Sequence, residues 1–193
     1  EIKSLGEIEL PGISNDIPKN KLSYRTAFHS CNDFLWFEEK HLAADKLDFL
    51  EDVLIDHNAS EIKILGSKMF NQGIDTEFFT RIKEFKNKLQ QKNIKLYVKI
   101  ATSRELHKKF HDRFVIGSNN LWSLPPISAV FQGSASTFNQ HIAGSSQFEQ
   151  FSKEFDEWWN HPDALDIFTE WNKIEIIDNL KSNSLRSPKK YRC

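Results

Sequence analysis

Cysteine is scarce in this chain of 193 residues, and its scarcity excludes two classes of protein. Cys31 and the C-terminal Cys193 are too few for a disulfide framework, and they do not form the paired spacing of a structural metal site. We therefore expect a reducing, cytoplasmic setting rather than a disulfide-stapled secreted domain. We also expect no metal and no other cofactor.

Long apolar runs and an excess of charge are lacking as well. No stretch approaches the roughly twenty apolar residues that span a bilayer, and the N-terminus lacks the basic-then-apolar order of a secretion signal. The 26 Lys and Arg against 27 Asp and Glu leave a formal net charge of −1. No global field therefore draws the chain to a polyanion, and any such contact must be local.

Apolar and aromatic residues make up 39% and 12% of the chain, which is enough to fill the core of one α/β domain of this length. Residues 1–20 show no sustained period and are predicted to form an arm or linker. Residues 21–180 are predicted to form a single domain, and residues 181–193 a basic tail. Because the chain begins with Glu1 rather than Met, we expect a longer polypeptide with an N-terminal module.

Helical and strand patterns alternate along the middle of the chain. Alternating or continuous apolar runs predict strands, and apolar residues three and four apart predict helices. The predicted strands are 34–37, 61–66, 94–100, 114–116 and 127–131, and the predicted helices are 43–57, 75–92 and 147–160. Because helices that link successive strands make parallel neighbours, the pattern predicts an α/β fold with a mainly parallel, mixed sheet flanked by helices.

Three shorter segments complete this prediction. Residues 101–110 are predicted to be a basic connecting loop. Pro125 and Pro126 follow a turn-rich segment, so the strands on either side of it are predicted to form a hairpin. Residues 174–177 are predicted to be an edge strand.

The strand 114–116 is preceded by His111, Asp112 and Arg113. Side chains two residues apart on a strand project from the same face, so the imidazole and the guanidinium form a phosphate-handling pair. Further along, Gly133 and the small polar residues after it offer backbone amides and hydroxyls to an anion. Together these segments predict a phosphate site.

The two segments resemble the core motif of the phospholipase D-like superfamily, which is His-x-Lys with an Asp five residues after the Lys, then Gly-Ser-x-Asn. His111 stands at the nucleophile position, and Arg113 replaces the Lys. Ser118 stands in place of the Asp, and Ser136 in place of the Asn. With Trp122 nearby, this variant is similar to the phospholipase D-like C-terminal domain of MIT-domain proteins, a branch in which some members bind rather than cleave.

The resemblance implies a metal-independent phosphodiesterase with His111 as the nucleophile. Its imidazole would attack phosphorus in line and form a phosphohistidine that water resolves, while Arg113 would bind a non-bridging oxygen. Enzymes of this superfamily pair two copies of the motif. Because this chain has one copy, the resemblance implies a homodimer in which one His111 attacks and the other protonates the leaving group. The alternative acids within the chain are His29, His107 and His141.

Further residues are predicted to bind phosphate: Lys109, Ser134, Ser136 and Thr137. Serine and threonine also cap helices at turns, so the hydroxyls serve either role. His111 and Arg113 likewise either handle phosphate or anchor a hairpin. Glu38 and Glu39, at the end of the first strand, are expected to line the same crevice, because ligands gather beyond the carboxyl ends of parallel strands.

Two functions stay open. The first is a nuclease domain of the phospholipase D-like type, favoured by a short chain without a lipid-insertion element. The second is a catalytically degenerate module that binds nucleic acid phosphate or phosphoinositide headgroups, favoured by the missing Lys and Asp. The partner is in either case a nucleic acid or another phosphodiester ligand. No metal site is predicted, because His107 and His111 lack a supporting Cys or carboxylate.

Overall fold

The computed structural model describes residues 7–110, 113–133 and 136–177. Its helices are α1 (Ile17–His29), α2 (Ala44–Leu54), α3 (Thr76–Gln91), α4 (Arg104–Lys109), α5 (Ile127–Gln132), α6 (Ser146–Trp159) and α7 (Trp171–Glu175). Its strands are β1 (Phe34–Glu38), β2 (Glu61–Ser67), β3 (Lys95–Ala101), β4 (Arg113–Ile116), β5 (Asn120–Leu124), β6 (Asn139–Ile142) and β7 (Ala164–Asp166). The predicted tail, residues 181–193, lies outside the described residues.

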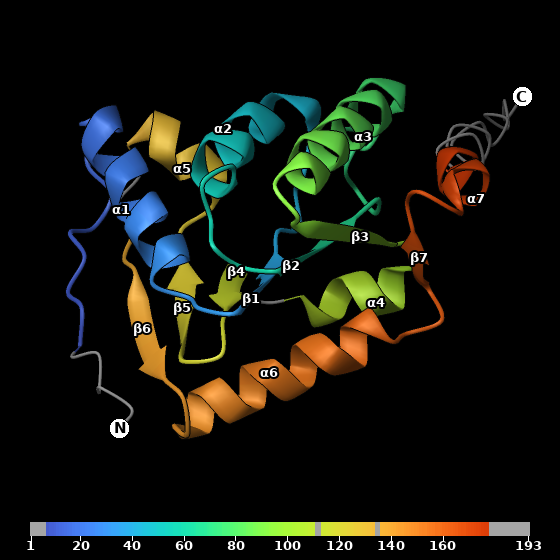
Figure 1. Ribbon diagram of the computed structural model, residues 1–193. Helices are drawn as coiled ribbons and strands as arrows, with labels where there is room; N and C mark the ends of the chain where they lie inside the picture. Colours follow the sequence, from blue (N-terminus) through green and yellow to red (C-terminus); the bar gives the residue numbers. More distant parts are fainter. Residues whose placement is uncertain (1–6, 111–112, 134–135, 178–193) are drawn as a thin grey trace, which may run out of the picture.

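The strands form one sheet in the order β6-β5-β4-β1-β2-β3-β7 (Figure 1). The predicted α/β fold with a mixed sheet flanked by helices is confirmed. The prediction of a mainly parallel sheet is wrong, because β1 with β2 and β2 with β3 are parallel pairs, whereas the other four pairs are antiparallel. Only residues 117–119 join β4 to β5, and so short a link cannot make the crossover that parallel neighbours need.

Helices cover both faces of the sheet. Figure 1 shows α1, α2, α3 and α5 on one face and α4 and α6 on the other. Strand alternation divides the apolar residues between the faces: Phe37 contacts Phe28 of α1, while Trp36 stacks on Phe155 of α6. The larger core cluster lies beneath the first group of helices, and a smaller aromatic cluster lies beneath α4 and α6.

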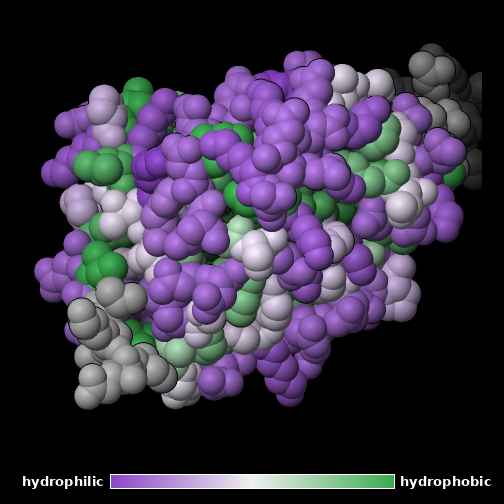
Figure 2. All heavy atoms as spheres, viewed as in Figure 1, coloured by the Kyte–Doolittle hydropathy of each residue, from purple (hydrophilic) through white to green (hydrophobic). Residues whose placement is uncertain are grey.

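The surface in the same view is mostly hydrophilic, with apolar residues in separate small patches (Figure 2). Among the described residues, no helix combines the length and the apolar character that a membrane crossing requires.

Three short helices replace segments that were predicted otherwise. Residues 104–109 form α4 rather than a loop, because Ser103 caps the helix by accepting from Leu106 N at 3.2 Å. The predicted strand 127–131 lies in α5, and the returning strand of the hairpin is β5 instead. Residues 174–177 are not a strand. Ile174 is buried in α7, the helix that begins at Trp171.

The N-terminal helix α1 begins inside the segment predicted to be an arm. Asp16 caps it by accepting from Lys19 N, and a proline in the first turn suits a position where no amide bond is needed. The chain before α1 runs beside β6, where Ile8 N donates to the Gln140 side chain at 2.7 Å.

Candidate functional site at the carboxyl ends of the parallel strands

Polar and charged side chains gather where β1 and β2 end and β4 begins. Glu38 lies opposite Leu65 of β2 and Phe114 of β4, so these strand ends meet at one edge of the sheet. α4 lies beside this edge (Figure 1). We define the carboxyl-edge cluster as Glu38, Glu39, Ser67, Lys68, His107 and Arg113. All of them are buried except Arg113, whose side chain is 22% exposed.

Glu39 holds Arg113 in place. Arg113 Nε donates to both carboxylate oxygens of Glu39, at 3.0 Å and 3.2 Å, and Glu39 also accepts from His41 N at 2.9 Å. A buried carboxylate needs such partners, because a charge that loses its solvation without gaining them costs on the order of several kcal/mol of stability. Within the described residues, Nε is the donor in every side-chain hydrogen bond of Arg113. Both Nη groups therefore keep their donors for another acceptor.

Ser67 and His107 form a second buried pair. Ser67 Oγ and His107 Nδ1 lie 2.8 Å apart, and Ser67 Oγ accepts from Met69 N at 3.1 Å. When the Ser67 hydroxyl donates to Nδ1, the proton of a neutral His107 ring is on Nε2. A ring oriented by such a bond is suited to proton transfer.

Two lysines add positive charge at the same edge. Lys68 is buried, and its Nζ donates to the Ile74 carbonyl. Lys40 Nζ donates to the Phe110 carbonyl at 3.1 Å, next to the position of His111 in the chain. Among the described residues of this region, Lys40, Lys68 and Arg113 give three formal positive charges against the two formal negative charges of Glu38 and Glu39, an excess of one that suits an anion.

His41, at the rim of this region, is held neutral. Burial lowers the pKa of His41, and Arg113 acts in the same direction, whereas Glu39 opposes the shift. A neutral imidazole here adds no charge to the balance.

The structure places four of the six predicted site residues. Arg113 begins β4 and joins the carboxyl-edge cluster. Lys109 is exposed at the C-terminal end of α4. Ser136 and Thr137 lie between α5 and β6, where the Ser136 carbonyl accepts from Ile13 N at 2.9 Å. Within the described part of the chain, no hydrogen bond joins Ser136 or Thr137 to Arg113. The remaining two, His111 and Ser134, lie outside the described residues.

Two other motif positions lie at the opposite end of β1. Ser118 Oγ donates to Asp33 Oδ2 at 2.5 Å, and Trp122 Nε1 donates to Ser30 Oγ at 2.7 Å. Both contacts hold the turn before β1 against the β4–β5 hairpin. The residue in place of the family's Asp therefore has a structural partner away from Arg113.

The alternative acids separate in the same way. His107 belongs to the cluster, whereas His29 Nε2 bonds the Val53 carbonyl at 2.8 Å and His141 lies on β6, two strands beyond β4. The sequence prediction of Glu38 and Glu39 at this edge agrees with the structure. It missed Ser67 and Lys68, for which the available signal was a polar pair directly after a buried strand.

The described residues contain no group of three or more His, Cys, Asp or Glu placed to hold a metal ion. Burial raises the pKa of the Cys31 thiol to about 12, so this cysteine stays protonated and is no nucleophile.

Comparison with known proteins assigns the chain to no family, because no family model and no curated protein matches it. One similar solved structure is TrmBL2, an archaeal chromatin protein described as showing a novel mode of DNA binding. It is 16% identical, and the match covers 82% of this chain and 55% of that one at a TM-score of 0.45. The chain thus spans about half the length of TrmBL2. A similarity this remote says nothing about activity.

Proposed function

We propose that the protein is a metal-independent phosphodiesterase of the phospholipase D-like type, acting as a nuclease domain. The observation that supports this proposal is the bond between Arg113 and the buried Glu39. It fixes a guanidinium, with Nη donors to spare, two residues from His111 and at the edge of the sheet where ligands gather. Glu39 is then a positioning residue and Arg113 the phosphate ligand.

In the proposed reaction, a ring nitrogen of His111 forms a bond to phosphorus as the bond from phosphorus to the leaving oxygen breaks. The leaving oxygen takes a proton from a general acid. Water then attacks phosphorus, the nitrogen–phosphorus bond breaks, and the former acid accepts the water's proton. The acid is the second His111 of a homodimer or, within one chain, His107, whose ring Ser67 orients.

A second candidate is a degenerate module that binds nucleic acid phosphate or phosphoinositide headgroups without cutting them. Arg113 itself favours this alternative. A guanidinium cannot give up its proton, and one held by Glu39 binds a phosphate equally well before and during reaction, which promotes binding more than turnover.

Hydrolysis of bis-nitrophenyl phosphate and of single-stranded DNA in excess chelator separates the two candidates. The proposal expects turnover that resists the chelator and is abolished in His111→Ala. The matched control is His161→Ala, because His161 lies beyond α6 and outside the cluster. Phosphodiester binding without turnover, in wild type as in His111→Ala, establishes the module. If wild type shows no binding and no turnover, both candidates are contradicted.

A further inference from the structure

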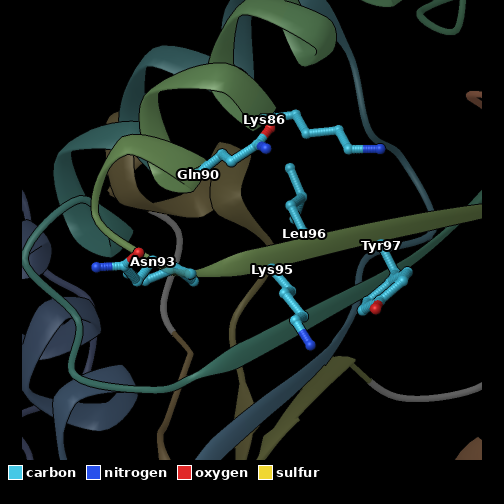
Figure 3. Close-up of a pocket in the computed structure, with 7 residues that line it drawn as sticks. Lys86, Gln90, Asn93, Lys95, Leu96 and Tyr97 are labelled. Carbon is cyan, nitrogen blue, oxygen red and sulfur yellow. The ribbon is translucent and has the colours of Figure 1, made fainter.

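The first half of β3 is an open edge of the sheet. β7 pairs only with Lys99–Ala101, and Ile167 N then donates to the Val98 carbonyl at 3.1 Å. Among the described strands, residues 95–97 therefore have β2 as their one neighbour. Beside this edge, between β3 and the end of α3, lies a hollow of about 450 Å³ (Figure 3). Its volume is in the range of small-ligand sites.

Positive charge without carboxylate partners surrounds this hollow. Lys86 of α3 and Lys95 of β3 line it, and neither has an ion-pair partner within the described residues. By contrast, Lys88 pairs with Glu51 at 2.6 Å, on another side of the same helix. Lys86 Nζ instead lies 3.9 Å from the ring centroid of Phe168, which leaves its charge available to an anion.

Tyr97 connects the hollow to one face of the sheet. Figure 3 shows Lys95 and Tyr97 pointing to one side of β3 and Leu96 pointing toward α3. Tyr97 is 38% exposed, and the strand register aligns it with Lys63 of β2 and Trp36 of β1. An exposed aromatic ring thus lies between the hollow and a row of lysine and tryptophan side chains.

The row continues as a stack of aromatic rings. Phe155 lies between Trp36 and Trp159, with ring centroids 5.3 Å and 5.8 Å apart and interplanar angles of 15° and 16°. Lys63 Nζ lies 4.8 Å from the Trp36 centroid, and Lys99 Nζ lies 5.1 Å from that of Trp159. Phe155 is buried, and the partly exposed members of the row are Trp36, Lys63, Lys99 and Trp159.

Two carboxylates accompany these lysines. Glu61 lies 3.3 Å from Lys63 Nζ, and Glu170 is close enough to Lys99 for the ammonium to help lower the pKa of its carboxyl, so the four lysines Lys63, Lys86, Lys95 and Lys99 outnumber them. The charge of this surface consequently complements a polyanion.

From this arrangement we propose that the open edge of β3 and the adjoining face bind single-stranded nucleic acid. Lys86 and Lys95 contact phosphates, and Tyr97 stacks on a base. A single strand presents phosphates and unstacked bases together, whereas a duplex hides its base faces and an acidic peptide leaves Tyr97 without a stacking partner. The inference names the substrate class of the proposed function and rests on that function for cleavage, while the binding stands by itself.

The distance between the two sites suits a polymer. β3 has seven residues and is roughly 20 Å long at about 3.3 Å per residue, and Arg113 lies on β4, three strands from β3 and so about 14 Å to the side at about 4.8 Å per strand. Several nucleotides are therefore needed to reach from the open edge of β3 to Arg113 at the carboxyl edge. A mononucleotide is too short to span both sites.

Fluorescence anisotropy with labelled oligothymidylate and oligouridylate, in excess chelator, tests the proposal. Tyr97→Ala is expected to weaken binding about 5- to 150-fold because the ring no longer stacks on a base, while Tyr97→Phe binds like wild type. The double variant Lys86→Glu/Lys95→Glu is expected to bind more weakly and to lower the salt slope by about 0.7 for each phosphate that the protein no longer neutralises. The controls are Lys153→Glu on α6, where the side chain is 78% exposed, and Leu22→Ala on α1, and both bind like wild type. Thermal melting verifies that each variant is folded.

Three results would overturn the inference: no binding of either oligonucleotide by wild type, unchanged binding by the double lysine variant, or equal affinity for a duplex of the same length. Wild-type hydrolysis of bis-nitrophenyl phosphate, which is too small to reach both sites, reports separately on the proposed function. Ester hydrolysis without strand binding refutes the inference alone. Strand binding without ester hydrolysis refutes the phosphodiesterase alone.

Discussion

At the carboxyl edge, the two partners of the ion pair between Glu39 and Arg113 differ in solvent exposure. Glu39 is 1% exposed and Arg113 is 22% exposed, so water can solvate the arginine but not the carboxylate. Removing either partner breaks the same hydrogen bonds. The charge left behind differs, however, and an uncompensated charge costs most where water cannot reach it.

Arg113→Met is therefore expected to destabilise the protein more than Glu39→Gln does. Arg113→Met leaves a buried carboxylate unpaired and should cost about 3–5 kcal/mol, while Glu39→Gln leaves a partly solvated guanidinium and should cost about 1–3 kcal/mol. Urea unfolding measures both, and the double variant gives their coupling. Equal costs for the two single variants would show that Glu39 is better solvated than the structure indicates.

His57 is a second residue whose surroundings favour one protonation state. It is buried, its Nε2 lies 2.8 Å from the Phe28 carbonyl, and its Nδ1 accepts from Ala59 N at 3.0 Å. The two bonds require a neutral ring with its proton on Nε2. Burial lowers the pKa of His57, and the nearby His29 acts in the same direction, whereas the Phe28 bond opposes them.

The stability of the fold should therefore fall on acidification. Because the folded pKa of His57 lies below the unfolded value of about 6.5, the unfolded chain binds the proton first. The contribution of His57 is complete above that pH and is lost as the pH falls toward its folded pKa. Urea unfolding at a series of pH values gives the free energy of unfolding as a function of pH. The slope of that free energy against pH should be smaller in His57→Gln than in wild type. Identical slopes in the two proteins would assign the pH dependence to other groups.

Short elements depend on caps rather than on periodicity. α5 follows Pro125 and Pro126, which lack the amide hydrogens that would continue β5, and it ends at Gly133 with φ at 68°. A Cβ on Gly133 would lie 2.4 Å from the Asn15 side chain. Gly133, which the sequence motif suggests as an approach to an anion, thus also ends a helix against the N-terminal segment.

Two glycines with positive φ allow a matched comparison. Gly144→Ala, at φ 87° with nothing within 4 Å of the new Cβ, should cost about 1 kcal/mol for backbone strain alone. Gly133→Ala should cost more, about 2 kcal/mol, because Asn15 must also move. Thermal and urea unfolding measure the difference. A smaller cost at Gly133 would contradict the close approach of Asn15.

The long elements were predictable and the short ones were not. α3 and β3 extend over 16 and 7 residues, enough for a helical or an alternating period to emerge, and both lie where the sequence predicts them. α4 and α7 have 6 and 5 residues, less than two turns. At that length the cap at Ser103 and the stacking of Trp171 on Phe79 decide the conformation, and neither is visible as a period.

The assembly of the whole molecule bears on the proposed chemistry, because one copy of the motif supplies one His111. A second chain would provide the general acid, or His107 would do so within the same chain. The two arrangements differ in the mass of the active species.

Light scattering is expected to give the mass of two chains, with specific phosphodiesterase activity falling on dilution as the dimer dissociates. His107→Ala should then retain most of the activity. A monomer that hydrolyses bis-nitrophenyl phosphate would refute the homodimer, and loss of that activity in His107→Ala, with His29→Ala as the control, would assign the acid to His107.

Local patterns of residues were enough to predict the alternation of helices and strands, the aromatic core and the place of Arg113 at the start of a strand, because each depends on neighbours a few positions apart. Folding alone established the direction of the outer strands, the bond from Arg113 to Glu39 across 74 positions and the pairing of Ser67 with His107 across 40. Such contacts depend on how distant segments pack, and the desolvation of buried charges selects among packings that local spacing leaves equally open.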